Sequence, residues 1–284
     1  MHRSGTSALT HALVEMGAFA GSPESLMPSA PDNPEGFFEA QEFSFVNMTL
    51  LKLRQTEWFD PPRLGLGPYT RPGLFPLQQR ARFFLDGLAG DALAAGKKIT
   101  VIKDPRACIS FPFWAPLLKN PVVILCLRAP SAVARSLQKR NNLLEPYGRW
   151  LYAWYLSRAL DAAEDGISAV VFYEELISNP LEALAPVAGA LGIEAVLKDK
   201  DTRARLQKLV RPEMNHGADG DMHAFDSAYE SLRKGPRDLK SFLPKFRAAL
   251  EPVLATHAES LPQPLRIGIN RLIGRKGGAR LASD

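Results

Sequence analysis

The residues best suited to chemistry stand at the start of the chain. Arg3-Ser-Gly-Thr-Ser7 directly precedes a segment with the pattern of a helix. The first N–H groups of a helix lack partners inside it, and the helix dipole places about half a positive charge there. Gly5 lets the main chain approach an oxyanion, three hydroxyls add donors (Ser4, Thr6 and Ser7), and Arg3 adds a permanent charge with a planar donor fork. The segment predicts a phosphate or sulfate site; the alternative is a capped helix start with a chance arginine.

This loop differs from the phosphate loop of ATP- and GTP-binding proteins. It lacks the Gly-Lys-Ser/Thr ending, and with it the hydroxyl that holds Mg²⁺ against a triphosphate. A donor that needs less charge neutralisation fits better. A sulfuryl group carries less negative charge than a phosphoryl group, so its transfer needs no metal. No metal-ligand spacing is present either, so we expect no metal cofactor.

A second anion site is predicted at the end of a buried strand. The apolar run 122–127 should deliver Arg128 to the carboxyl end of a sheet, where α/β folds bind ligands. Pro130 suits the first turn of a following helix, which places Ser136 in about its second turn. Arg128 and Ser136, eight residues apart, are predicted to bracket one further phosphate.

Elements that position these residues follow from apolar periodicity and turn residues. Helices are expected at 8–16, 40–54, 76–95, 130–141, 147–164 and 181–191, and strands at 99–103, 122–127 and 168–173. Strands alternating with helices predict an α/β fold with three layers and a mostly parallel sheet flanked by helices. We expect one domain over 1–284, with a core at about 1–195 and a helical, loop-containing extension at 196–284. Phosphate loops normally follow a central strand, so an upstream strand is expected to be missing from this chain; the alternative is a misassigned start site.

Composition narrows the class of protein. The chain of 284 residues is 46% hydrophobic and 23% charged, which is typical of a globular protein. A net charge of +5 fits an anionic ligand better than extended nucleic-acid contact. No apolar run approaches the ~20 residues of a membrane span, and no signal peptide is recognisable, so a cytoplasmic protein is expected. The tail from about residue 266 is basic; we interpret it as solvated, the alternative being peripheral contact with a membrane or another anionic partner.

Four segments resemble motifs of the sulfotransferase family, whose donor is 3′-phosphoadenosine 5′-phosphosulfate. They are His2-Arg-Ser-Gly-Thr-Ser7, Asn33-Pro-Glu-Gly-Phe-Phe-Glu39, the pair Arg128 and Ser136, and the stretch from Phe172-Tyr-Glu-Glu-Leu176 through Asn179-Pro180 to Leu191-Gly192. The resemblance covers about residues 1–195 and implies a fold like that of P-loop nucleotide-binding proteins. It also implies that residues 3–7 hold the 5′-phosphosulfate, that Arg128 and Ser136 hold the 3′-phosphate, and that Tyr173 lies near the adenine.

Transfer of a sulfuryl group needs a cation at the leaving oxygen and a base at the acceptor hydroxyl. Arg3 is the first candidate for the cation and Lys103 the second; the alternative for Lys103 is a salt bridge to Asp104 or Glu39. Glu39 is the first candidate for the base, a position that the resemblance also implicates, and Asp104 is the second. The alternative for Glu39 is a carboxylate facing a helix dipole.

The acceptor is expected to be a carbohydrate or glycolipid hydroxyl. Aromatic residues are dense at 57–76 and 147–158, and such rings stack on sugars, although core packing is the alternative for the second segment. Two other classes of function remain open. One is a nucleotide-dependent kinase, against which the missing Walker lysine argues; the other is a catalytically inactive nucleotide-binding module.

Overall fold

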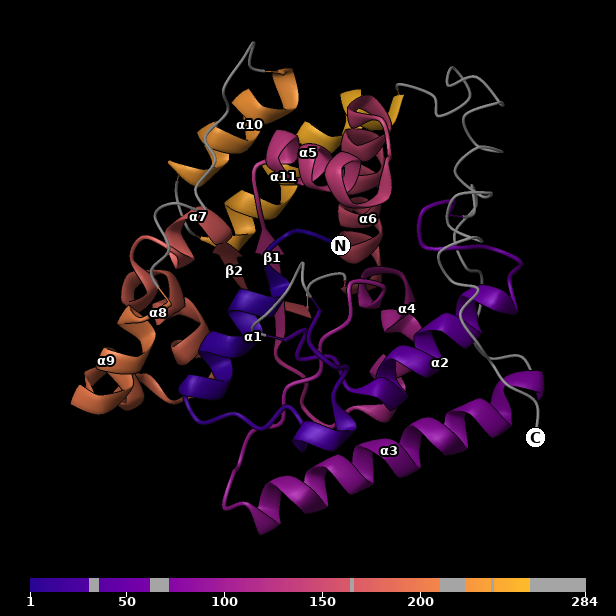
Figure 1. Cartoon of the computed structure of the whole chain (residues 1–284). Coiled ribbons are helices and arrows are strands. Elements are labelled where there is room, and N and C mark those ends of the chain that lie inside the picture. The colour runs from indigo at the N-terminus through magenta and orange to yellow at the C-terminus, as the bar shows by residue number, and fades with distance from the viewer. Residues whose placement is uncertain (31–35, 62–71, 164–165, 210–222, 236–237, 256–284) are drawn as a thin grey trace.

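The computed structural model describes residues 1–30, 36–61, 72–163, 166–209, 223–235 and 238–255 (Figure 1). The α-helices are α1 (Thr6–Glu15), α2 (Gln41–Lys52), α3 (Phe75–Ala94), α4 (Ala107–Trp114), α5 (Pro130–Asn141), α6 (Glu145–Ala163), α7 (Tyr173–Leu176), α8 (Pro180–Leu191), α9 (Lys200–Gln207), α10 (Ala224–Arg233) and α11 (Leu239–Ala255). The strands are β1 (Val123–Leu127) and β2 (Ile167–Phe172). Short 3₁₀ helices are η1 (Pro23–Ser25), η2 (Pro72–Leu74), η3 (Ala115–Leu117) and η5 (Glu194–Lys198).

The sheet of the described residues has two parallel strands. β1 pairs with β2 so that Leu127 lies opposite Phe172, and α5 and α6 form the crossover between them. The expected third strand at 99–103 is wrong: Thr100 forms only an isolated bridge with Phe19. A β-branched run becomes a strand only where a neighbour pairs along its length, and the neighbour here pairs at one residue. In the part of the chain that the structure describes, the fold is therefore mixed α/β but mostly helical, and the expected three-layer arrangement around a broad parallel sheet is not observed.

Helices nevertheless cover both faces of this small sheet. Leu125 and Leu127 of β1 lie in the larger apolar cluster with α4, α6 and α11, whereas Cys126 lies in the smaller cluster with α1 and α8. Successive side chains of a strand point to opposite faces, so a strand buried on both faces needs an uninterrupted apolar run. Figure 1 shows α1 and α8 beside the strands on one side and α6 on the other. This explains why 122–127 could be recognised from sequence.

Several helices begin and end where local chemistry places them. α5 and α8 each start on a proline, which suits the first helical position because its missing N–H would have no helical partner. α8 ends at Gly192 with φ 66°, a left-handed conformation that glycine adopts readily. α4 was not predicted, because Phe111-Pro-Phe-Trp114 carries a proline and no helical period. Its Phe113 and Trp114 are nevertheless fully buried in the larger cluster.

The extension after residue 195 takes part in the same packing as the rest of the chain. Phe225 and Tyr229 of α10 and Phe242 and Phe246 of α11 all belong to the larger apolar cluster. Many of the aromatic side chains of α6 are buried there too, which fits core packing rather than sugar stacking for that helix. The basic tail lies outside the described residues.

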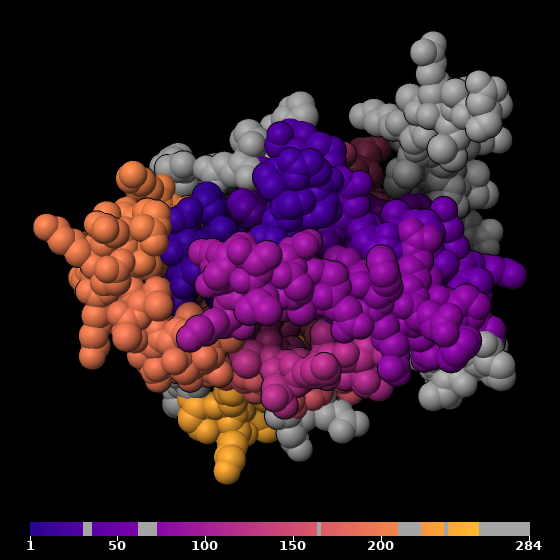
Figure 2. All heavy atoms as spheres, turned by 90° about the horizontal axis from the view of Figure 1, so that it is seen from below, coloured from indigo at the N-terminus to yellow at the C-terminus, as the bar shows by residue number. Residues whose placement is uncertain are grey.

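α2 and α3 form the outer part of the molecule. Figure 2, a view from below, shows α3 lying across the surface. Only Ala81, Leu88 and Ala92 of its 20 residues are buried, while Phe83 is 83% exposed. In the described part of the chain, no helix combines the length and the apolar character needed to cross a bilayer.

Candidate functional site

A tight turn at Gly5 places the start of α1 against Tyr173. Gly5 has φ 87° and Arg3 has φ 66°, so the main chain is left-handed at both residues before the helix begins at Thr6. A Cβ atom on Gly5 would lie 2.2 Å from Cδ2 of Tyr173. Glycine is therefore required at position 5 for two reasons: the left-handed backbone conformation, and the lack of room for a Cβ atom beside the Tyr173 ring. Gly5 is the N-cap residue of α1 and, as a glycine, has no side chain with which to cap it.

This double requirement predicts that Gly5→Ala will destabilise the fold more than Gly17→Ala. Gly17 also has a positive φ, 101°, but an added Cβ there meets nothing within 4 Å. Both variants carry the conformational cost of about 1–2 kcal/mol. Gly5→Ala adds an overpacking cost of about 1–3 kcal/mol. Urea unfolding measures both losses, and equal losses would contradict the contact with Tyr173.

The predicted anion-binding residues meet on one side of this turn. Arg3 Nε donates to Ser136 Oγ at 2.7 Å, and Arg128 Nη1 donates to the carbonyl of Arg3 at 3.2 Å. The guanidinium of Arg128 lies over the ring of Tyr173, 4.5 Å from its centroid. Arg128 and Tyr173 directly follow β1 and β2, whose last residues are paired in register. The structure thus brings together two guanidinium groups, a hydroxyl and an aromatic face from four segments.

The candidate catalytic pair contacts the same loop through Ser7. Lys103 Nζ donates to Glu39 Oε1 at 2.7 Å and to Ser7 Oγ at 3.1 Å. The side chains of Lys103 and Glu39 are only 9% and 13% exposed. Ser7 in turn donates to the carbonyl of Phe37, which ties the 36–39 segment to the start of α1. The salt bridge weighed as the alternative for Lys103 is present, and it joins the two catalytic candidates.

Burial favours the neutral form over the charged form of both Glu39 and Lys103. Desolvation raises the pKa of Glu39, and the neighbouring Lys103 opposes that rise. Desolvation likewise lowers the pKa of Lys103, against the attraction of Glu39. A carboxylate with a raised pKa is a stronger base than an exposed glutamate, and a cation beside it keeps the ionised form accessible. The pair has the electrostatics of a proton-accepting site.

Two other predicted residues have different surroundings. Asp104 is fully buried in a bidentate pair with Arg106, at 2.7 and 2.6 Å, and also accepts from Ser44 Oγ. Its oxygens are engaged in the core, which leaves Glu39 as the better placed carboxylate. The hydroxyl of Ser4 is also buried and donates to a main-chain carbonyl at 2.7 Å, so Ser4 offers its backbone rather than its side chain.

The loop before Glu39 packs over α1 through its aromatic residues. Phe38 stacks on His11 with centroids 5.0 Å apart. The guanidinium of Arg140 lies over the ring of Phe37, 5.8 Å from the ring centroid, so Arg140 lies beside the 36–39 segment. The first part of the resembling motif, 33–35, lies outside the described residues.

His2 is a feature of the loop to which sequence reasoning gave no role. Its ring lies 4.3 Å from that of Trp58, and its Nε2 is buried with no hydrogen-bond partner among the described residues. Burial, reinforced by the cations Arg106, Arg140 and Lys103, holds the pKa of His2 well below its usual value. A neutral imidazole therefore lies beside Trp58. The adjacency of His2 to Arg3 was its only sequence signal.

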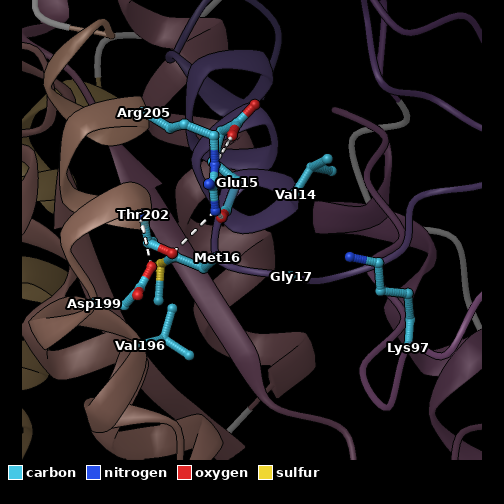
Figure 3. Close-up of a pocket in the computed structure, with 9 residues that line it drawn as sticks. All are labelled: Val14, Glu15, Met16, Gly17, Lys97, Val196, Asp199, Thr202 and Arg205. Atoms are coloured by element: carbon cyan, nitrogen blue, oxygen red, sulfur yellow. Dashed lines mark hydrogen bonds and ion pairs between the residues drawn. The ribbon is translucent and has the colours of Figure 1, made fainter.

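A pocket of about 390 Å³ opens at the other end of α1 (Figure 3). Its charged groups are largely paired: Arg205 bonds Glu15 at 2.8 Å and also contacts Thr202. The lining, which includes Gly17, Lys97 and Asp199, contains none of the residues predicted for donor binding or catalysis. The candidate site thus belongs to the N-terminal end of α1.

The residues around the Gly5 turn suit a nucleotide with phosphate groups at both ends of its ribose. Two arginines, the hydroxyls of Ser7 and Ser136 and the first turn of α1 are donors of the kind that bind oxyanions, and Tyr173 lies buried under the guanidinium of Arg128. The donor set therefore fits 3′-phosphoadenosine 5′-phosphosulfate in its chemistry. Compared with protein-family models, with curated proteins and with solved structures, the chain matches none of them at a level that would indicate a relationship.

Proposed function

We propose that this protein is a sulfotransferase that uses 3′-phosphoadenosine 5′-phosphosulfate and sulfates a hydroxyl of a carbohydrate or glycolipid. One observation carries the proposal: Arg3 of the Gly5 turn contacts Arg128 and Ser136, and Ser7 of the same loop contacts the buried Lys103–Glu39 pair. A phosphate-binding loop that adjoins a carboxylate–lysine pair is what transfer from a phosphosulfate to a hydroxyl requires.

Each residue has a separate task in this proposal. Arg128 and Ser136 hold the 3′-phosphate, and Tyr173, buried under the Arg128 guanidinium, supports that guanidinium near the adenine. Arg3 and the start of α1 hold the 5′ group. When bound, the donor supplies the sulfuryl group, which passes to the acceptor oxygen while adenosine 3′,5′-bisphosphate leaves.

Glu39 and Lys103 act on the acceptor's proton and on the charge of the leaving group, respectively. Glu39 accepts the proton of the acceptor hydroxyl, for which a raised pKa is an advantage. Lys103 lies 3.1 Å from Ser7 in the anion-binding loop, so it places a positive charge beside the group that leaves. Both functions depend on burial, because a screened surface pair would interact weakly with a reacting group.

The proposed acceptor class rests on the surroundings of this pair. Trp58 lies beside the neutral His2 of the loop, and its partly exposed aromatic ring suits stacking on a sugar ring. The wider aromatic segment 62–71 is outside the described residues. We therefore propose the acceptor as a class and not as a compound.

Nucleotide binding and transfer of labelled sulfate test the proposal together. The protein is titrated with adenosine 3′,5′-bisphosphate and with ATP, with and without Mg²⁺, and is then assayed with labelled donor against a panel of glycans and glycolipids. Metal-independent binding of the bisphosphate and labelled product support a sulfotransferase. Binding without product on any acceptor favours an inactive nucleotide-binding module, and Mg²⁺-dependent preference for ATP favours a kinase.

Arg128→Ala is expected to weaken binding of adenosine 3′,5′-bisphosphate at least about tenfold, because a charge-assisted bond to phosphate is lost. Affinity for adenosine 5′-phosphate should change little, since that ligand has no 3′ group. Isothermal titration measures both. Lys139→Ala, on the exposed end of α5, is the control for lost positive charge. Unchanged bisphosphate affinity in Arg128→Ala would contradict the assignment.

A further inference from the structure

Tyr152 of α6 fixes the main chain of Arg128 through a single hydroxyl. Its oxygen accepts from the N–H of Arg128 at 2.9 Å and donates to the carbonyl of the same residue at 3.0 Å. A hydroxyl has one proton and two lone pairs, so these two bonds use its donor and one acceptor position. Tyr152 is 1% exposed, which excludes competition from water. The orientation of the Arg128 backbone is thus set from inside the core.

The residues that follow Arg128 are held by two carboxylates. The N–H of Ala129 donates to Glu174 Oε1 at 2.9 Å. Ser131 donates to Asp226 through its N–H at 2.9 Å and through its hydroxyl at 2.6 Å. Asp226 is 2% exposed and belongs to α10, so the C-terminal extension reaches the start of α5.

α10 also holds Glu174 in place. Tyr229 Oη donates to Glu174 Oε2 at 2.5 Å, while its ring packs against Phe172, the last residue of β2, at 5.5 Å. Phe225, one turn earlier, packs against Tyr152 with centroids 6.2 Å apart. Each group that fixes the chain around Arg128 is therefore itself in contact with α10. Figure 1 shows α10 beside α5 and α7.

These contacts also determine which donors remain for an anion. The N–H groups of Ala129 and Ser131, at the start of α5, already bind carboxylates. A phosphate in this region must therefore be held by side chains, chiefly the guanidinium of Arg128, whose direction depends on the fixed main chain. Small errors in placing such a group weaken binding strongly.

We propose that α10 is a positioning element of the donor site: Tyr229 and Asp226, acting through Glu174 and the start of α5, orient Arg128 together with Tyr152. The inference rests on the proposed function, because the group that Arg128 recognises is the 3′-phosphate of the donor. Residues 224–233 thereby acquire a role that their distance in sequence from the motifs does not indicate.

Titration of two nucleotides against hydroxyl-deletion variants tests this role. Tyr152→Phe and Tyr229→Phe keep the buried rings, and each is expected to bind adenosine 3′,5′-bisphosphate about 5–10-fold more weakly, as for loss of a hydrogen bond in a charged network. Affinity for adenosine 5′-phosphate should stay within about twofold, a selectivity that a general loss of stability would not produce. In an Arg128→Ala background, Tyr229→Phe should have no further effect.

Two further variants sharpen the comparison. Tyr155→Phe is the matched control, because Tyr155 is a buried residue of α6 whose hydroxyl donates to the carbonyl of Trp58 and not to Arg128. Asp226→Ala should repeat the selective loss, whereas Asp226→Asn should restore most of the affinity because its amide oxygen still accepts from Ser131. Thermal unfolding of each variant confirms that it is folded at the titration temperature.

The outcomes separate this inference from the proposed function. If the wild-type protein binds the bisphosphate and the tyrosine variants match it, or lose both nucleotides equally, positioning by α10 is overturned while the proposed function stands. If the wild-type protein binds neither nucleotide, both fall. A selective loss that disappears in the Arg128→Ala background supports the inference.

Discussion

Glu39→Gln is expected to lower the turnover of sulfuryl transfer at least about 100-fold, the usual scale for removal of a general base. The change keeps the size of the side chain and its ability to accept from Lys103 Nζ, which lies 2.7 Å from Glu39 Oε1 in the wild-type protein. It removes the proton-accepting carboxylate. The donor should still bind, because Glu39 bonds with Lys103, whereas Arg128 and Ser136 bond with Arg3. Steady-state assays at saturating donor separate the two effects.

The pH profile gives this prediction a second readout. Only the ionised carboxylate accepts a proton, so activity should rise with pH as Glu39 loses its own proton. Because burial raises the pKa of Glu39 above the ordinary value of 4.5, the midpoint of this acidic limb should lie above 4.5. The limb should disappear in Glu39→Gln, and Glu39→Asp should retain it with reduced turnover.

Glu39→Gln also breaks the ion pair with Lys103, so a control variant must show the effect of losing an ion pair alone. Glu42→Gln removes a carboxylate at the start of α2 that pairs with Arg80. It should leave turnover close to that of the wild-type protein. Near-normal turnover in Glu39→Gln, or equal losses in the two variants, would remove Glu39 as the base.

Local patterns predicted most of the elements. β1 and β2 lie within one residue of the predicted strands, and α5 and α8 begin at or next to the predicted positions, because apolar runs, prolines and a terminal glycine determine them locally. The prediction of a strand at 99–103 was wrong because the structure of this run is not determined locally. Whether it becomes a strand depends on a pairing partner elsewhere in the chain, which its own residues do not specify.

In the candidate site too, local patterns were predictable and long-range contacts were not. Residues 3–7, Arg128 and Ser136 stood out because their types and spacing suit anions, and the structure places Arg3 in contact with both Arg128 and Ser136. The partners of Asp104 were not predictable in detail, since a carboxylate before Pro105 gives no indication that Arg106 and Ser44 will enclose it. The contact of Asp226 with Ser131 spans 95 positions in sequence, and no local pattern encodes it.

Arg3→Ala is expected to reduce turnover at least about 100-fold, the scale found when a donor that stabilises developing negative charge is removed. Arg3 lies in the anion-binding loop, and its Nε bond to Ser136 at 2.7 Å holds the guanidinium near the start of α1. Alanine at φ 66° has the same backbone strain as arginine, so the substitution changes the charge without a new conformational cost.

Arg3→Lys distinguishes charge from geometry. Lysine keeps a positive charge but lacks the planar fork that binds two acceptors at once, so this variant should retain more activity than Arg3→Ala. Arg205→Ala is the control for lost charge, since Arg205 pairs with Glu15 at the far end of α1. If Arg3→Ala and Arg205→Ala have the same turnover with labelled donor, Arg3 does not act on the leaving group. A loss confined to Arg3→Ala and partly restored in Arg3→Lys places the developing charge at the Gly5 turn, because Arg3 is then needed for its position as well as its charge.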